Sequence, residues 1–275
     1  MNDLTVETYT AAESALFVNS HVVTTADGLL LVDATLLVSD ARALADRLAR
    51  TGKPVLAAFV THPHPDHFNG LPYVIDEDVP VYATAAVAQV IKESAEDKRA
   101  QWQPTYGAEW PDRYRVPDRT PAGGTVDVGG LRVHLHDVGP AESHADSYLV
   151  VESGTARAAF IGDLAFDGVH SYTADGHSGQ WLDVLDRLTG ELAGLTLYPG
   201  HGAPGDVSLL ARQQRYLRTY REKVRELAGG ADRLTEEQKL ELAGTMTGLL
   251  PDATLTWLIG HGADAVAREL AERAR

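Results

Sequence analysis

The feature that most constrains this chain is a dense run of histidine and aspartate directly after an apolar stretch. Residues 54–60 are short, apolar and continuous, which is typical of a strand buried on both faces. The run from Thr61 to His67 follows at once and contains two prolines, which stiffen it and disfavour helix before each of them. Because open α/β sheets place their sites beyond the carboxyl ends of strands, we expect this run to form a site.

Four side chains of the run are potential metal ligands, namely His62, His64, Asp66 and His67. Neutral imidazole and carboxylate bind zinc and its neighbours in the transition series. Since alternate residues point apart, the spacing suits two ions, with His62 and His64 on one, and Asp66 and His67 on the other. The competing interpretation is a histidine-rich surface turn, but a dense His/Asp cluster after a strand seldom has only a structural explanation.

The run resembles the His-x-His-x-Asp-His signature of the metallo-β-lactamase superfamily, and Thr61 and Gly70 strengthen the match. The later ligands of that family have candidates in the expected order. His144 lies after a Gly-containing turn and before a strand, Asp163 ends an apolar strand, and His201 lies in a Gly-rich turn after a strand. All seven positions are present, and the resemblance covers residues from about 15 to 205.

The resemblance implies a four-layer αββα sandwich of the α/β (α+β) class, with the metals at one edge between the sheets. It implies two zinc ions, although iron or manganese also suits such ligands. The implied ligands of the first ion are His62, His64 and His144. The implied ligands of the second ion are Asp66, His67 and His201, and Asp163 is implied to bridge the two ions.

The implied function is a dinuclear zinc-dependent hydrolase, in which a metal-bridging hydroxide cleaves an ester, thioester, lactone or lactam. Asp66 is expected to be both a ligand and a catalytic proton relay. The chain contains no cysteine, so it lacks the cysteine ligand that one subclass of zinc β-lactamases uses. The Asp163 bridge instead resembles the glyoxalase II and lactonase-like branches of the superfamily.

The charge composition of the chain restricts the kinds of molecule that it is expected to bind. The chain of 275 residues has 24 Lys and Arg against 39 Asp and Glu, a net charge of -15. Such acidity argues against nucleic acid and anionic membranes as partners, and solubility alone explains it. The expected partner is a small-molecule substrate. Neither a secretory signal nor an apolar stretch long enough to span a bilayer is evident, so we expect a cytoplasmic protein. The oligomeric state is open, and a homodimer is possible.

The order of expected elements divides the chain at residue 205. Residues 1–205 are expected to form the catalytic domain, and residues 206–275 a helical extension packed on it. Helix caps are expected at Ser39, Thr84 and Asp206, and Thr235 with Gln238 predicts a capping box. The helix after Thr84 is expected to end near residue 98. Residues 99–124 then look irregular, and a connection this long predicts either a lid or a loop that its aromatic residues pin to the body.

This segment supplies most of the candidate substrate contacts, Trp102, Tyr106 and Trp110. His177, in a loop before a predicted helix, is a further candidate, although a plain surface histidine is the simpler interpretation. His134 and His136 alternate on a predicted strand, and we assign them to the sheet face because a full ligand set exists without them.

The main alternative function is a mononuclear iron oxidoreductase on the same fold, similar to persulfide dioxygenases. Such enzymes need only positions like His62, His64, His144 and Asp163, so the complete second set favours hydrolysis. A nuclease is disfavoured by the acidic charge, and a non-catalytic binding protein would more plausibly have lost a ligand.

Overall fold

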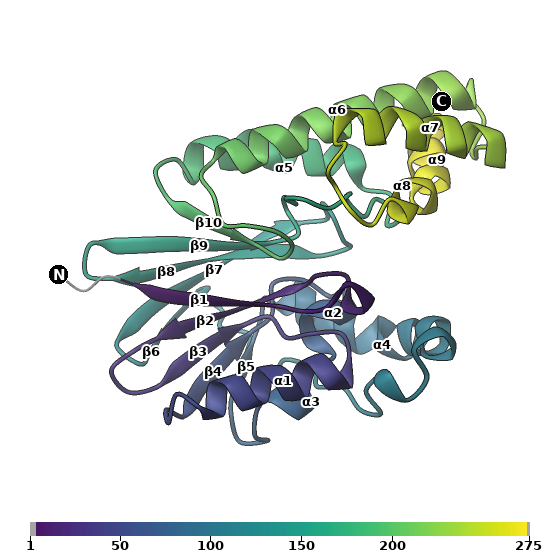
Figure 1. Cartoon of the computed structure of the whole chain (residues 1–275). Coiled ribbons are helices and arrows are strands. Elements are labelled where there is room, and N and C mark those ends of the chain that lie inside the picture. The colour runs from purple at the N-terminus through teal and green to yellow at the C-terminus, as the bar shows by residue number, and fades with distance from the viewer. Residues whose placement is uncertain (1–3, 274–275) are drawn as a thin grey trace. The chain divides into compact units, whose positions relative to one another are not determined.

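The computed structural model describes residues 4–273. The chain forms two compact units (Figure 1). Unit 1 contains residues 1–139 and 145–162, and unit 2 contains residues 140–144 and 163–275. The predicted boundary at residue 205 therefore lies inside unit 2. The division into a catalytic domain, residues 1–205, and a helical extension, residues 206–275, stays a prediction.

The first sheet of unit 1 is mixed, and its strands follow the chain in the order β1-β2-β3-β4-β5. These strands are β1 (Thr5–Thr10), β2 (Asn19–Thr24), β3 (Leu29–Val32), β4 (Val55–Phe59) and β5 (Val81–Tyr82). The first three strands pair antiparallel, whereas β3, β4 and β5 pair parallel. Strand β3 is wholly buried, as its continuous run of aliphatic residues predicts.

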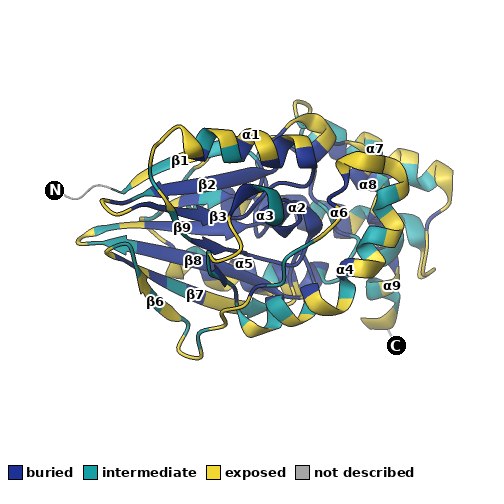
Figure 2. Cartoon of the chain, turned by 90° about the horizontal axis from the view of Figure 1, so that it is seen from below, coloured by how far each residue is buried: buried dark blue, intermediate teal, exposed yellow. Residues whose placement is uncertain are grey.

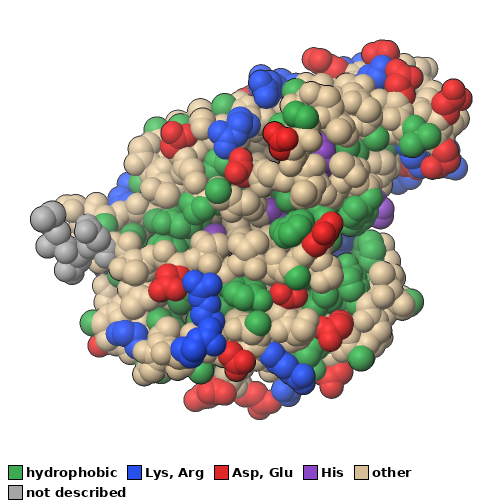
Figure 3. Space-filling model, in the orientation of Figure 1, with side chains coloured by type: hydrophobic (Ala, Val, Ile, Leu, Met, Phe, Trp, Pro, Cys, Tyr) green, Lys and Arg blue, Asp and Glu red, His purple; other side chains and the backbone are tan. Residues whose placement is uncertain are grey.

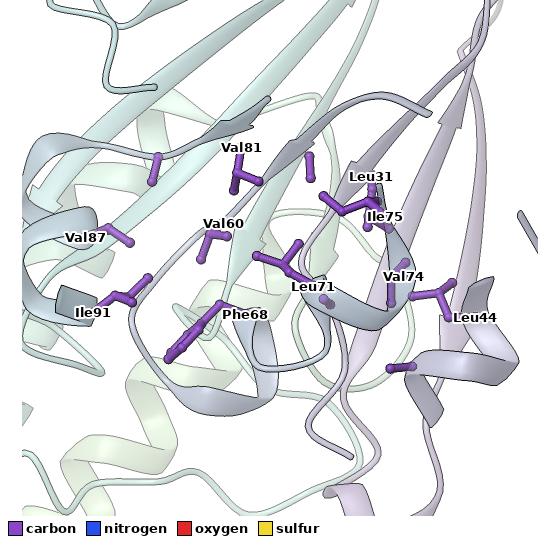
Figure 4. Packing of buried hydrophobic residues seen from close by; sticks show 14 of the residues in the cluster. Leu31, Leu44, Val60, Phe68, Leu71, Val74, Ile75, Val81, Val87 and Ile91 are labelled. Carbon is purple, nitrogen blue, oxygen red and sulfur yellow. The ribbon is translucent and has the colours of Figure 1, made fainter. Parts of the chain in front are cut away.

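Helices cover one face of this sheet. They are α1 (Val38–Ala49), α2 (Pro65–Phe68), α3 (Leu71–Val74) and α4 (Ala85–Tyr106), and a short 3-10 helix, η1 (Glu13–Ala15), precedes β2. The apolar sides of these α-helices meet alternate residues of β3 and β4 in one buried cluster, which includes Leu31, Leu44, Phe68 and Ile91 (Figure 4). Each such side chain stabilises the fold by about 1.5–3 kcal/mol on burial. In Figure 2 the strands of this sheet are mostly buried, and α1 shows its exposed residues on its outer side.

Four further strands of unit 1 form an antiparallel run, β9-β8-β7-β6. They are β6 (Thr125–Val128), β7 (Leu131–Gly139), β8 (Asp146–Ser153) and β9 (Ala156–Gly162). The two sheets meet where His21 of β2 contacts Phe160 of β9, with ring centroids 5.5 Å apart. The end of β4 and the end of β9 both lead into predicted ligand residues.

Unit 2 contains one strand and five α-helices among its described residues. They are α5 (Ser178–Glu191), β10 (Thr196–Pro199), α6 (Ser208–Ala228), α7 (Glu236–Leu249), α8 (Trp257–His261) and α9 (Ala263–Arg273). The capping box of α7 is confirmed, since the Thr235 side chain accepts from the Gln238 backbone and Gln238 accepts from the Thr235 backbone. The predicted fold class is also confirmed, because the chain combines two sheets with flanking helices and ends in helices.

Of the three helix caps predicted at single residues, two differ from the prediction. Thr84 caps α4 as expected, accepting from the Val87 N–H at 3.3 Å. Helix α1, however, begins at Val38, so Ser39 lies in its first turn and Leu37, which has no polar side chain, occupies the cap position. The Ser39 N–H donates to the Glu109 carboxylate at 3.0 Å. Asp206 accepts from the Ser208 N–H at 2.9 Å, but the residue at the cap position of α6 is Val207.

The expectation that residues 99–124 are irregular is wrong for their first third. Helix α4 continues through Pro104 to Tyr106, and a short 3-10 helix, η2 (Gly107–Glu109), follows it. The physical reason is packing, because Trp102 and Tyr106 lie four residues apart on one helix face and pack against a buried cluster. That contact outweighs the one hydrogen bond that a proline removes. Residues 110–124 are irregular apart from a bridge between Arg119 and Tyr82.

Among residues 4–273, no helix is long and apolar enough to cross a membrane. On the face seen in Figure 3, acidic and basic side chains are interspersed, and no basic stripe crosses it.

Candidate metal centre

The predicted ligand loop of unit 1 is buried and compact. His62, His64, Asp66 and His67 are exposed by 1%, 8%, 7% and 0%. Ring nitrogens of His62 lie within 4.8 Å of those of His64 and His67. The Nε2 atom of His67 lies 3.6 Å from Asp66 Oδ2. The chain turns into α2 directly after His64, with Pro65 in its first turn, and this turn brings the two pairs together.

A residue outside the motif, Asp33, orients this loop. Its carboxylate accepts hydrogen bonds from the Thr61 N–H at 2.8 Å and from the Thr61 hydroxyl at 2.7 Å. The Nδ1 atom of His67 lies 2.9 Å from the same carboxylate. Because a carboxylate only accepts, Nδ1 of His67 carries the hydrogen and Nε2 carries the lone pair that binds a metal.

The same carboxylate reaches His62 through Thr61. The Thr61 hydroxyl uses its hydrogen on Asp33, so it accepts at its contact with His62 Nδ1, 3.0 Å away. His62 is therefore also held with its lone pair on Nε2. One aspartate thus sets the tautomer of two predicted ligands, the role that outer carboxylates have in metal sites.

A glycine preserves the space that this arrangement needs. Gly162 ends β9 with φ of 48°, and a Cβ atom there would lie 2.6 Å from the Thr61 hydroxyl. Gly70 has a similar role, because its Cβ would lie 2.8 Å from the Thr35 carbonyl oxygen, which accepts from the Gly70 N–H at 2.7 Å.

Unit 2 holds the other predicted ligands, and two of them lie together. Asp163 and His201 are both 4% or less exposed, and Asp163 Oδ2 lies 3.3 Å from His201 Nε2. The His201 ring stacks on Phe166, with centroids 5.4 Å apart and planes at 21°. Gly202 follows with φ of 96°, where a Cβ would lie 2.0 Å from the Asp167 carbonyl oxygen, so this turn also requires glycine.

His144, the third predicted ligand in unit 2, lies at the surface beside His177. Its side chain is 55% exposed. Its Nδ1 atom lies 2.7 Å from His177 Nε2, and His177 Nδ1 lies 3.1 Å from Gln180 Oε1. Glu142, two residues earlier, is only 1% exposed. The sequence analysis did not single out Glu142 or Asp33, although Asp33 at the end of the β3 pattern was a usable signal.

The candidate substrate residues of unit 1 divide into two kinds. Trp110 is 4% exposed and belongs to a buried cluster with Leu36 and Leu37, so it holds its segment to the body. Trp102 and Tyr106 are only half-buried against that cluster. Burial, and then the charge of Asp66, raise the pKa of the Tyr106 hydroxyl, so this hydroxyl lies within electrostatic reach of a predicted ligand.

The two histidines assigned to the sheet face lie there. His136 stacks on Tyr148 of β8 with centroids 4.5 Å apart, and His134 contacts Glu152 at 3.3 Å and Thr125 at 3.1 Å. All of these residues belong to the antiparallel run, and no predicted ligand is among the contacts.

The donor set fits divalent metal ions. Two ligand atoms of one tetrahedral zinc lie roughly 3.4 Å apart, given bond lengths near 2.1 Å. The Asp66–His67 and Asp163–His201 pairs, at 3.6 and 3.3 Å, match that separation. Among residues 4–273, the buried carboxylates are Asp33, Asp40, Asp66, Glu142, Asp146 and Asp163, whereas Arg221 is the sole buried Lys or Arg. A bound metal cation is one of the ways in which a protein compensates buried carboxylates.

The fold of this chain and its buried groups of His and Asp are those of a superfamily of metal-dependent hydrolases. The model of the metallo-beta-lactamase superfamily matches residues 14–201, and the chain belongs to this family.

Solved structures show the same fold. A metallo-beta-lactamase from Pontibacter korlensis is 23% identical, with 79% of this chain and 96% of that chain covered, and a TM-score of 0.61. A beta-lactamase domain protein from Burkholderia ambifaria is 16% identical, with 100% of this chain and 88% of that chain covered, and a TM-score of 0.67. The DIM-1 metallo-beta-lactamase is 20% identical, with 79% and 98% covered, and a TM-score of 0.56.

Proposed function

We propose that this protein is a dinuclear zinc-dependent hydrolase that cleaves a carbonyl substrate, an ester, thioester, lactone or lactam. The observation that carries the proposal is the buried ligand loop of unit 1, in which one carboxylate, Asp33, fixes both His62 and His67 in the metal-binding tautomer. A purely structural histidine cluster has no need for two imidazoles with the same tautomer. Family membership supports the same chemistry.

The residues have distinct proposed roles. His62 and His64 bind the first ion, Asp66, His67 and His201 bind the second, and Asp163 bridges them. His144 is the proposed third ligand of the first ion. When bound, two divalent ions supply a nucleophile that is deprotonated near neutral pH and polarise the attacked carbonyl.

Asp66 has a second proposed role in moving a proton. One of its oxygens, Oδ2, lies 3.6 Å from His67 Nε2, a separation that suits two ligands of the same ion. A carboxylate has a second oxygen, which can take a proton from the nucleophile and return it to the leaving group. The Tyr106 hydroxyl, whose pKa burial and the Asp66 charge raise from an ordinary value of 10.0, is a hydrogen-bond donor at neutral pH.

Trp102 and Tyr106 are proposed to contact the substrate, because they are half-buried on one face of α4. Trp110 is proposed to act through them by anchoring the end of α4. His177, which is half-buried beside His144, is a further proposed substrate contact. The substrate is proposed to be a small molecule in the cytoplasm. Zinc is the proposed metal, with iron or manganese as competitors for the same ligands.

The test is a panel of initial rates with zinc-loaded protein. The panel contains an aryl ester, a glutathione thioester, an acylhomoserine lactone, a cephalosporin and a phosphodiester. We expect one carbonyl substrate to be cleaved far faster than the rest. We expect His67→Ala and Asp163→Ala to be inactive, and His136→Ala, an exposed histidine on β7, to keep the wild-type rate.

Two results would contradict this function. One is the absence of any rate above that of the inactive variants. The other is bound iron with oxygen uptake on a glutathione persulfide, which would make the protein an oxidoreductase of the same fold.

A further inference from the structure

The predicted ligand pair of unit 2, Asp163 and His201, lies on two short segments that contact each other. The Asp167 N–H donates to the His201 carbonyl at 3.1 Å, which ties the backbone of one segment to that of the other. Phe166, one residue earlier, stacks on the His201 imidazole, with ring centroids 5.4 Å apart and planes at 21°. Because rotation of the imidazole would break this stacking, the Phe166 ring restricts the direction in which His201 points.

Side chains of helices α5 and α6 hold Phe166 in place. The indole N–H of Trp181, in α5, donates to the Leu164 carbonyl at 2.9 Å, and its ring meets the Phe166 ring at 62° with centroids 6.1 Å apart. The amide oxygen of Gln213, in α6, accepts from the Phe166 N–H at 3.3 Å. The amide nitrogen of Gln213 donates to the Ser171 hydroxyl oxygen at 2.9 Å. One side chain of α6 therefore fixes two points of the segment that follows Asp163.

The burial of Gln213 makes this contact specific. Gln213 is 3% exposed, and glutamine is mostly exposed in proteins unless its amide is hydrogen-bonded. Loss of the amide would take this acceptor away from the Phe166 N–H, and a buried donor without its acceptor forces the segment to move. Gln213 also lies beyond residues 14–201, the part of the chain that matches the family model. Its contact is therefore a contribution of the helical part of unit 2.

We propose that Phe166 and Gln213 are positioning residues of the metal centre, which hold the His201 imidazole at the angle at which it binds an ion beside Asp163. The inference rests on the proposed metal centre. Gln213 fixes the backbone of Phe166, and the Phe166 ring fixes the imidazole. Asp163 Oδ2 lies 3.3 Å from His201 Nε2, so rotation of the ring would separate two atoms that are already spaced for one ion. Outer partners orient metal ligands in this way.

The first measurement is zinc binding by Phe166→Leu and Gln213→Leu. The first change removes the ring and the second removes the amide, and both keep a buried side chain of similar size. Affinities are measured by competition with a chromophoric chelator. We expect each variant to weaken one of two zinc equivalents by about 10–100-fold, the usual effect of losing an outer partner of a ligand. We expect the other equivalent to keep its affinity.

Two controls separate positioning from general stability. Val224 is fully buried in α6, about three helical turns beyond Gln213, so Val224→Ala lowers Tm without reaching the segment that Gln213 holds. Gln214→Leu removes the neighbouring amide, which donates to Asp186 of α5 at 2.7 Å. We expect both controls to bind two zinc ions with wild-type affinity at temperatures at which they are folded.

A second measurement observes His201 itself and does not depend on whether Gln213→Leu folds. The protein is labelled with nitrogen-15 at histidine and loaded with cadmium-113, and couplings between the metal and ring nitrogens are recorded. The His201 signals are assigned as those that His201→Ala lacks. We expect a coupling to His201 in the wild type and in Val224→Ala, and its loss or weakening in Phe166→Leu.

The inference is overturned if Phe166→Leu and Gln213→Leu keep both zinc affinities and the His201 coupling, or if Val224→Ala loses zinc to the same extent. These outcomes are distinct from failure of the proposed function. A protein with two ions and the expected losses in both variants that hydrolyses nothing would contradict the function alone. An active hydrolase whose two variants bind zinc as the wild type does would contradict this inference alone. A wild type that binds no zinc would contradict both.

Discussion

At the scale of residues, the site depends on a few side chains that hold others in place. Asp33 lies 28 positions before Thr61, yet its carboxylate contacts Thr61 and His67. Its backbone has φ of 60°, an uncommon value for a residue other than glycine. Such backbone strain is retained where the surrounding structure requires it. In this protein the strained Asp33 holds two imidazoles in a fixed orientation.

Replacing the orienting carboxylate tests this role. Asp33→Asn keeps the size of the side chain but replaces one acceptor oxygen by an NH2 donor. The remaining oxygen cannot accept from all three donors, the Thr61 N–H, the Thr61 hydroxyl and His67 Nδ1. We expect zinc affinity to fall by about 10–100-fold, the usual effect of losing an outer partner of a ligand. Competition with a chromophoric chelator measures it, with the exposed Asp78→Asn as the control. Unchanged affinity would show that Asp33 has no role in metal binding.

A second residue-scale prediction concerns Gly162. In Gly162→Ala, the alanine has to adopt a left-handed backbone conformation, which lowers the free energy of unfolding by about 1–2 kcal/mol. It also meets the Thr61 hydroxyl, where overpacking costs about 1–3 kcal/mol more. The matched control is Gly154→Ala, because Gly154 has φ of 59° but no atom within 4 Å of the added Cβ. Urea unfolding of both variants separates the two costs, and equal losses of stability would mean that Gly162 does not protect Thr61.

At the scale of elements, local patterns predicted β4 and the start of α7, whereas contacts between elements decide the end of α4 and the cap of α1. The continuous apolar run of β4 and the Thr235–Gln238 capping box are local signals, and both elements formed as predicted. The end of α4 is not local, because Trp102 and Tyr106 extend the helix past Pro104 by packing on another cluster. The cap of α1 likewise comes from Glu109, 70 residues away from Ser39.

The link between β1 and α1 gives a pH-dependent prediction. The Tyr9 hydroxyl donates to Asp40 Oδ1 at 3.0 Å. Burial and then the Asp40 carboxylate raise the pKa of Tyr9 to about 12, from an ordinary value of 10.0. Because the folded state favours the protonated tyrosine, its contribution is present below pH 10 and is lost as the pH rises towards 12.

The measurement is the free energy of unfolding from pH 8 to 12 for the wild type and Tyr9→Phe. The variant lacks the hydrogen bond, so it should be less stable at pH 8 and should lose less stability than the wild type above pH 10. Parallel curves for the two proteins would mean that Tyr9 does not titrate in this range.

At the scale of the whole molecule, the acidity of the chain continues into its buried parts. Among residues 4–273, six carboxylates and one arginine are buried. Metal ions bound by some of these carboxylates would compensate part of their charge. The sequence alone gave the net charge of -15 but not which carboxylates are buried. His144 could be identified in the sequence from its position in the motif. That Glu142 is buried and the His144 side chain is exposed could not be predicted, because burial depends on tertiary structure.

Removal of metal should therefore destabilise the protein. Metal at about 1,000 times its Kd stabilises the folded state by roughly 4 kcal/mol. For a chain of this size that is roughly 10 °C in Tm, so dialysis against a chelator should lower Tm by about that amount. Zinc should restore Tm, whereas magnesium, which prefers all-oxygen ligands, should not. A Tm that is the same with and without chelator would contradict the account of the buried carboxylates.

The central claim is that His62, His64, Asp66, His67, Asp163 and His201 belong to a centre of two ions. The most direct test is the number of zinc ions bound per chain at saturation, measured by mass spectrometry of the metal after gel filtration. We expect two zinc ions for the wild type, and fewer than two for His67→Ala. A wild-type chain that saturates with one ion, or that binds none, would contradict it.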